Sequence, residues 1–159
     1  GNSKSNLYGP AFTLKGYAPI NPKFSLIYGL NYSSLRGDNI RADRKIKLGG
    51  IYTNMDTNDF EFYGFNYQEK QVKDLISLTL GFKHKVVYSL YFSTKFNLAT
   101  FNEENFMQNN RAQMWKDYSK GLAFSLSYDS PIGPIEFSES SDLKNKKPIG
   151  SISIGYKFD

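Results

Sequence analysis

The residues of this chain that could carry out hydrolysis are its one histidine, His84, and the adjacent pair Asp129 and Ser130. Serine, histidine and aspartate are the groups that nucleophilic acyl transfer uses, with histidine as the base. Their sequence context does not support that chemistry, because Ser130 belongs to a Ser-Pro-Ile-Gly turn and not to a Gly-x-Ser-x-Gly elbow. Asp129 is better explained as a turn cap. We therefore predict no catalytic residue and no enzyme activity within the chain.

Metal and nucleic-acid sites are also not indicated. The sequence has no cysteine and a single histidine, so it offers neither a thiolate nor a cluster of nitrogen and sulfur ligands. No Asp-x-Asp-x-Asp-Gly calcium loop occurs. The net charge of +5 is scattered and forms no basic stripe with interleaved aromatics. We expect no metal, no cofactor and no nucleic-acid partner.

The elements of the chain are indicated by apolar residues at every second position, a period that gives a strand one apolar and one polar face. The pattern is clearest over 24–32, 76–82, 88–98, 122–128 and 152–158. Weaker strands are predicted near 8–18, 43–52 and 134–141, for a total of eight. The polar face consists mostly of Ser, Thr, Gly, Ala and Asn, which suit a crowded or water-filled interior better than the outer face of a soluble sheet.

The composition agrees with a barrel in lipid. The 13 Phe and 12 Tyr, with one Trp, bring aromatics to 16% of the residues, as expected of lipid-facing aromatic belts. No run approaches the roughly 18–20 apolar residues of a membrane helix. We predict an all-β fold, an antiparallel up-and-down transmembrane β-barrel of about eight strands. It forms a single domain over residues 1–159, in contact with the lipid of a bacterial outer membrane.

The connections divide into short turns at one end and long loops at the other, as in outer-membrane barrels. Short turns are predicted at 35–39, at Val86 and Val87, and at a proline-rich periplasmic turn motif. That motif consists of Ser130, Pro131, Ile132, Gly133 and Pro134. The long loops are 53–71, 100–118 and 142–148. A short connection at 19–22 falls on the long-loop side and breaks the pattern.

Charged residues also occupy the polar phase of the strands. The predicted lumen charges are Lys45, Lys47, Lys83, Lys95, Asp129 and Glu136, with Glu139 as a further carboxylate. They either select ions and pair with one another or form a solvated lumen wall, and we favour the solvated wall. The loop 53–71, with Tyr63, Gly64 and Phe65 as the candidate gate, either folds inward as a plug or stays outside as a binding surface.

Residues 121–138, Gly-Leu-Ala-Phe-Ser-Leu-Ser-Tyr-Asp-Ser-Pro-Ile-Gly-Pro-Ile-Glu-Phe-Ser, and the last strand resemble the C-terminal end of the bacterial surface antigen superfamily. The superfamily comprises barrel-assembly proteins, two-partner-secretion translocators and patatin-like phospholipase autotransporters. Its barrels have sixteen strands, and this chain looks like the last eight, a C-terminal half-barrel. The resemblance implies a C-terminal insertion signal for the barrel-assembly machinery. It would consist of Ile152, Ile154, Tyr156 and Phe158.

Upstream, residues 44–50, Arg-Lys-Ile-Lys-Leu-Gly-Gly, are similar to the family strand that precedes an inward-folding loop. In the family the tip of that loop is Arg-Gly-Tyr or Arg-Gly-Phe, and its arginine contacts an acidic residue of the lumen wall. The matching triplet here is Tyr63-Gly64-Phe65, without the arginine. The difference moves the resemblance toward the patatin-like branch, for which the lipase domain would lie outside this chain.

A half-barrel cannot lie in lipid with two open edges, because each unpaired backbone group there costs several kcal/mol. The chain must close on itself, pair with a second copy, or belong to a larger polypeptide. We favour a homodimer that completes sixteen strands. The leading functional hypothesis is a translocation, assembly or anchoring barrel whose polar lumen is gated by the loop 53–71. The alternatives are a soluble or periplasmic ligand-binding β-barrel and a lipolytic enzyme, which would need a nucleophile with a partner base.

Overall fold

The structure is a computed structural model of the chain, and it describes residues 9–37, 40, 44–51, 58–102, 118–144 and 147–155. Ten strands make up the regular structure of these residues, in two sheets. None of the helices in this part of the chain has the length and apolar character needed to span a membrane.

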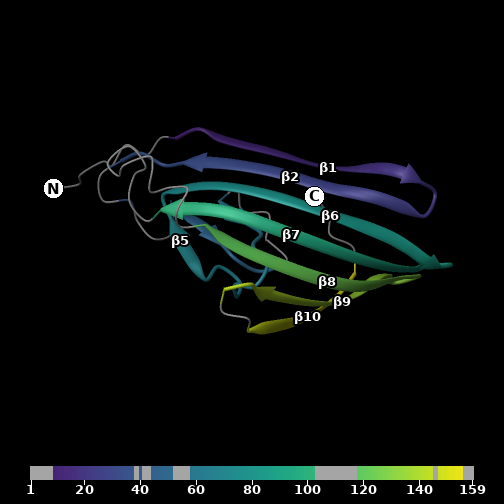
Figure 1. Cartoon of the computed structure of the whole chain (residues 1–159). Coiled ribbons are helices and arrows are strands. Elements are labelled where there is room, and N and C mark those ends of the chain that lie inside the picture. Colours follow the sequence, from purple (N-terminus) through teal and green to yellow (C-terminus); the bar gives the residue numbers. More distant parts are fainter. Residues whose placement is uncertain are drawn as a thin grey trace.

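Seven strands form one large sheet in the order β1-β2-β6-β7-β8-β9-β10, and each neighbouring pair is antiparallel. Figure 1 shows them side by side in a single curved sheet, with β1 at the top and β10 at the bottom. The predicted antiparallel β fold is confirmed. The strands are β1 (Ala11–Asn21), β2 (Phe24–Ser34), β6 (Asp74–Val87), β7 (Leu90–Asn102), β8 (Ser119–Ser130), β9 (Gly133–Asp142) and β10 (Pro148–Ile154).

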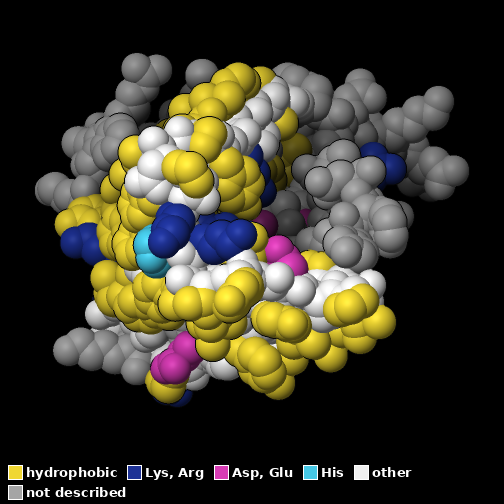
Figure 2. Space-filling model, turned by 90° about the vertical axis from the view of Figure 1, so that its right-hand side faces the viewer, with side chains coloured by type: hydrophobic (Ala, Val, Ile, Leu, Met, Phe, Trp, Pro, Cys, Tyr) yellow, Lys and Arg dark blue, Asp and Glu magenta, His cyan; other side chains and the backbone are white. Residues whose placement is uncertain are grey.

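The two faces of the large sheet differ as the alternation predicts. On β2 the side chains of Leu26 and Leu30 are about two-fifths exposed on the outward face, whereas Asn31 and Ser33 are buried on the inward face. Leu30 pairs with Leu78 of β6, so the register continues the apolar face from strand to strand. Viewed from the end of the sheet that carries the short turns, apolar side chains surround a hollow (Figure 2). The convex face is therefore apolar and the concave face polar.

A second, smaller sheet of β3 (Ile46–Leu48), β4 (Asp59–Phe60) and β5 (Lys70–Val72) is ordered β4-β3-β5. Ile46 and Leu48 are fully buried in a cluster with Phe62 of the following loop and with Leu75 and Ala99 of the large sheet. The predicted wall strand near 43–52 is therefore wrong. Its apolar residues face this inner core and not lipid, two environments that alternation alone cannot distinguish.

Because the segment 43–52 does not cross the wall of the barrel, two connections lie at a different end of the large sheet than predicted. The short turns are Pro22–Lys23, Tyr88–Ser89 and Pro131–Ile132, and all three lie at one end of the large sheet. The connection 19–22 was predicted on the long-loop side and in fact joins the short turns. A short turn was predicted at 35–39. Its described residues, 35–37, follow β2 at the opposite end of the sheet, where the long connection from β2 to β6 begins. For the strands that the structure describes, the two-residue turns therefore lie at one end of the large sheet and the longer connections at the other.

The large sheet has two edges, β1 and β10, and these do not pair with each other in the described part of the chain. Each edge strand leaves one row of backbone N–H and C=O groups without a strand partner. An open edge of this kind is not stable in lipid.

Candidate functional site

The feature of interest is the segment 61–69 between β4 and β5, which we call the inner loop. Its first half folds back on Gly50, because Phe62 N donates to Gly50 O at 3.1 Å and Gly50 N donates to Phe65 O at 3.0 Å. The rings of Phe62 and Phe65 pack 4.5 Å apart, centroid to centroid, in the core of the small sheet. The loop therefore has a tight, apolar base that presents Tyr63 and Gly64 as its tip.

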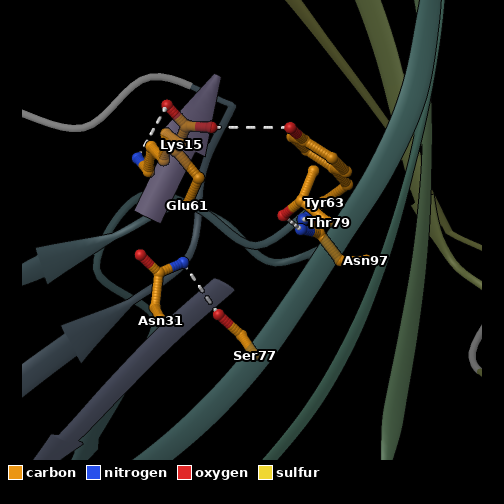
Figure 3. Close-up of polar contacts among 7 residues, drawn as sticks. All are labelled: Lys15, Asn31, Glu61, Tyr63, Ser77, Thr79 and Asn97. Atoms are coloured by element: carbon orange, nitrogen blue, oxygen red, sulfur yellow. Dashed lines mark hydrogen bonds and ion pairs between the residues drawn. The ribbon is translucent and has the colours of Figure 1, made fainter. Parts of the chain in front are cut away.

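The tip is hydrogen-bonded to two strands of the large sheet, β7 and β9, and through Asn97 it is linked to a third strand, β6. Tyr63 N donates to Asn97 Oδ1 of β7 at 3.1 Å, and Asn97 Nδ2 donates to Thr79 Oγ1 of β6 at 2.6 Å. Gly64 N donates to Ser140 Oγ of β9 at 3.2 Å. Asn97 is fully buried while the loop is docked. Figure 3 shows Asn97, Thr79 and Tyr63 close together.

The main chain of the tip lies directly against the main chain of the large sheet, whose strands form the wall of the barrel. A Cβ added to Gly64 would lie 1.8 Å from the backbone nitrogen of Asp142 on β9. One added to Gly121 on β8 would lie 2.0 Å from Tyr63 O. Gly64 also has φ of +91°, a conformation that residues with a Cβ rarely adopt. Close approach from both sides thus requires glycine in the loop and in the wall.

The Tyr63 side chain is almost wholly buried and joins a second set of contacts (Figure 3). Its OH donates to Glu61 Oε2 at 3.4 Å, and Glu61 Oε1 lies 3.9 Å from Nζ of Lys15 on β1. Lys95 Nζ lies 5.8 Å from the centroid of the tyrosine ring. Burial first, and the Glu61 carboxylate second, raise the pKa of Tyr63 well above its ordinary range. The phenol is therefore a neutral hydrogen-bond donor.

Two buried carboxylates fasten the ends of this region, and sequence reasoning missed both. Asp59 Oδ2 accepts from Gln68 Nε2 at 2.8 Å, and Asp59 Oδ1 lies 4.0 Å from Lys47 Nζ. Asp74, fully buried at the start of β6, accepts from Arg36 Nη1 at 3.2 Å. Asp74 and Arg36 lie 38 residues apart, and an alternation of apolar residues does not indicate either carboxylate contact.

The lumen side is not completely filled. A cavity of about 400 Å³ separates the inner loop at Phe65 and Asn66 from Ser140 on β9 and from Ile149 and Ser151 on β10. The inner loop therefore contacts β7, β8 and β9 but leaves open space beside β10.

Comparison with known families decides the identity at superfamily level. The profile of the OMP85 superfamily matches residues 17–158. The chain belongs to the OMP85 superfamily. The predicted resemblance to the bacterial surface antigen superfamily is confirmed at this level, and with it the β-barrel fold and the location in the bacterial outer membrane.

A similar solved structure is the crystal structure of BamA from Haemophilus ducreyi lacking POTRA domains 1–3. The TM-score is 0.62 at 14% sequence identity, and the alignment covers 92% of this chain but 35% of the BamA chain. The chain thus spans about a third of the length of that structure, and at this identity the likeness concerns the fold. No curated protein sequence matches the chain.

In this OMP85-superfamily chain, several of the predicted lumen charges lie on the concave face. Lys83 Nζ lies 4.3 Å from the centroid of the Tyr91 ring, and Glu136 Oε1 accepts from Ser138 Oγ at 3.2 Å. Lys95 Nζ lies near the ring of Tyr63, which is on the same side of the sheet. Figure 2 shows lysine and acidic side chains together in the hollow. The concave face of the large sheet therefore carries charges of both signs.

Other predicted charges lie elsewhere in the OMP85 fold. Lys47 is on β3 of the small sheet, and Lys45 directly precedes that strand. Asp129 is exposed near the end of β8, opposite Pro134. Glu139 had been predicted to face the lumen, and this is wrong. It pairs with Phe124 on the exposed, convex face, because Glu139 and the lumen-facing Glu136 are three residues apart and a strand puts them on opposite faces.

The predicted turn motif of this OMP85 chain joins β8 to β9. Ser130 Oγ donates to Gly133 O at 2.5 Å, Ile132 is exposed, and Pro131 and Pro134 flank the reversal. Ile152 and Ile154 are exposed on the convex face of β10, and the other two insertion-signal residues, 156 and 158, lie outside the described residues.

The structure does not bring the serine, histidine and aspartate together as a catalytic group. His84 pairs with Phe24 and Phe92 on the convex face of the large sheet, whereas Asp129 belongs to the concave phase of β8. Ser130 is engaged with the carbonyl of Gly133 in the turn.

Proposed function

We propose that the chain is the C-terminal part of an outer-membrane barrel that moves or assembles polypeptides, and that the inner loop is its gate. The observation that carries the proposal is the contact of the loop tip with the wall, where Gly64 lies against the backbone of Ser141 and Asp142. A segment packed this closely inside a barrel blocks passage at its level. The mechanism is physical: an apolar belt holds the barrel in lipid, and displacement of the loop opens the lumen.

The strength of the contact fits a reversible gate. Two backbone N–H groups at the tip, those of Tyr63 and Gly64, donate to wall side chains, and each such bond contributes about 1 kcal/mol. Below the tip, β8 offers the small residues Ala123, Ser125 and Ser127 to the lumen, which leaves room for an extended chain once the loop lifts. The loop is therefore held firmly enough to close and weakly enough to move.

Replacing residues 61–69 with a glycine-serine linker tests the gate. The full chain, with and without the replacement, is reconstituted in planar bilayers and its single-channel conductance is measured. We expect a larger conductance for the variant, because the lumen loses its obstruction. Ile132→Ser in the exposed β8–β9 turn is the matched control and should conduct like the parent chain. An unchanged current after the loop replacement would refute the gate.

Within the superfamily, we propose that the chain belongs to the patatin-like branch, as the membrane anchor of a passenger encoded outside residues 1–159. Support comes from the tip itself, where Tyr63 stands in place of the arginine expected of the assembly and secretion branches. On this proposal the chain performs no covalent chemistry, and insertion depends on the barrel-assembly machinery. The superfamily match favours this membrane barrel over the soluble alternative.

The edges β1 and β10 also require partner strands in lipid. A second copy of the chain is one candidate, since twofold symmetry would bring two such edges together. The mass of the detergent-solubilised protein, measured after crosslinking β1 to β10, tests it. A single-copy mass rejects the homodimer.

A further inference from the structure

A carboxylate interrupts the apolar convex face of the large sheet. The register aligns Leu26, Phe82, Thr94, Phe124 and Glu139 in one row across β2, β6, β7, β8 and β9. The other residues of that row are apolar or threonine, and Glu139 is exposed on the same face. In the described part of the chain Glu139 makes no hydrogen bond and no ion pair. An ionisable group at this place requires a partner if it is to stay charged.

The position of Glu139 along its strand places it inside the lipid-facing band. It lies six residues beyond Gly133, the first residue of β9 after the short turn. With a strand rise of about 3.3 Å and a tilt of about 40°, this distance corresponds to roughly 15 Å above the turn. The apolar band of such barrels is about 25 Å tall. Glu139 is therefore too far from the short-turn end for its carboxylate to reach water there, and it lies three residues before Asp142, the last residue of β9 at the other end.

The row continues from Glu139 to a gap at the edge of the sheet. Its neighbour on β10 is Gly150, and a Cβ added there would meet nothing within 4 Å. Around this point the convex face is indented by a hollow of about 930 Å³ with walls of Phe92, Phe124, Phe137 and Ile152. Glu139 on β9 and Gly150 on the edge strand β10 both line this hollow.

We propose that the strand pairing with the free edge of β10 carries a lysine or arginine in the row of Gly150, and that its side chain crosses the glycine to form an ion pair with Glu139. Two interstrand spacings of about 4.8 Å separate that position from β9. A long basic side chain and a glutamate together bridge this distance, whereas a bulkier residue than Gly150 would obstruct it. The cation is thus a feature of a partner strand and not of the described residues.

This requirement excludes β1 as the partner strand. On the convex face β1 carries Phe12, Leu14, Gly16 and Ala18, none of which is charged. They pair in that order with Tyr32, Leu30, Tyr28 and Leu26 of β2. Lys15 belongs to the concave phase and faces Glu61. Pairing of β10 with β1, whether in the same chain or in a second copy, would leave Glu139 uncompensated. The ion pair and the homodimer are therefore mutually exclusive: the proposal requires a partner strand of a different sequence, and a crosslinked mass of two copies joined through β1 and β10 would overturn it.

The sign of a stability change tests the ion pair. The protein is extracted from outer membranes in mild detergent with its natural partner strands, and the temperature at which the folded barrel disappears on semi-native gels is measured. Glu139→Gln and Glu139→Leu should both lower this temperature, with leucine lowering it more, because each leaves the partner cation uncompensated. Glu136→Gln, on the concave face of the same strand, is the matched control and should change it little. A higher or unchanged temperature for the Glu139 variants would overturn the proposal.

A crosslink on the unmodified protein gives a second readout that does not depend on a variant folding. A carbodiimide joins a carboxylate to an adjacent amine, and mass spectrometry identifies the two residues. A crosslink from Glu139 to a lysine outside this chain supports the proposal, whereas one to Lys144 or Lys147 of the adjacent hairpin overturns it. Without a crosslink the melting temperatures alone decide, because a carbodiimide does not couple a carboxylate to arginine.

Discussion

Adding one methyl group at the tip of the inner loop should undock it. In Gly64→Ala the new Cβ would lie 1.8 Å from Asp142 N and 2.3 Å from Ser141 C. Both are backbone atoms of β9, so no side-chain rotation relieves the overlap. The residue must in addition keep φ of +91°, which is unfavourable for alanine. The loop can accept the methyl group only by lifting from the wall.

The size of the shift toward the undocked loop can be estimated from the interactions that are lost when the loop lifts. Strain at positive φ contributes about 1 kcal/mol. Loss of the two tip hydrogen bonds, from Tyr63 N and Gly64 N, contributes about 1 kcal/mol each. Partial exposure of the Tyr63 side chain adds about 1 kcal/mol or more. A total of about 4 kcal/mol lowers the ratio of docked to undocked loop by roughly a thousandfold.

A buried thiol beneath the tip would report this change. The chain has no cysteine, so Ala123→Cys provides the only one. Ala123 is 4% exposed and packs with Tyr63 and Ile51. Its thiol should react with a water-soluble maleimide only while the loop is lifted. We expect Gly64→Ala to raise the labelling rate at least a hundredfold, short of the full ratio because labelling saturates once the loop is mostly undocked.

The control substitutes another glycine on the concave face. A Cβ added to Gly29 would lie 3.4 Å from Thr79 Cβ, an ordinary contact, so Gly29→Ala should leave the labelling rate unchanged. If Gly64→Ala labels no faster than Gly29→Ala, the close contact between tip and wall does not exist in the folded protein.

Two further predictions concern the same contact. Asn97→Ala leaves the buried Tyr63 N without an acceptor and should reduce the free energy of unfolding by about 1–3 kcal/mol, as measured by the urea midpoint. Thr79→Val removes only the hydrogen bond from Asn97 Nδ2 to Thr79 Oγ1 and should reduce the free energy of unfolding by less. The raised pKa of Tyr63 means that above pH 10 the unfolded chain releases the phenol proton while the folded chain retains it, so stability should fall as pH rises through that range. Tyr63→Phe should remove this part of the pH dependence, and equal slopes for the two proteins would contradict the burial of the phenol.

The wall of the barrel could be predicted from the sequence because each of its strands has one lipid-facing side. The alternation of Leu122, Phe124 and Leu126 with small residues on β8 is a direct consequence of that environment, and the structure has the same faces. The same reasoning failed for Ile46 and Leu48, since the inner core of the small sheet also selects apolar side chains at alternate positions. The alternating pattern indicates that a side chain is shielded from water, but it does not indicate whether lipid or protein shields it.

The contacts of the inner loop could not be predicted for a different reason. Docking depends on backbone groups of Tyr63 and Gly64 that meet Asn97 and Ser140, residues 34 and 76 positions away. Such pairings have no local signature. The one available signal was Gly64 itself between two aromatic residues, since glycine in a loop often marks a close approach of two backbones.

The identity of the tip residue bears on how the gate is held. In the superfamily resemblance an arginine would form a charged contact with the wall, and charge-assisted bonds are roughly twice as strong as neutral ones. Here the phenol of Tyr63 donates to Glu61 within the loop itself, and the links of the tip to the wall come from main-chain N–H groups. The Glu61 carboxylate adds a partly exposed ion pair with Lys15 of β1, a kind of contact that contributes little. Backbone donors carry no net charge, so salt screens these bonds little. The loop is therefore fastened chiefly by shape and by neutral hydrogen bonds, and its position should be set by an entering chain more than by ionic strength.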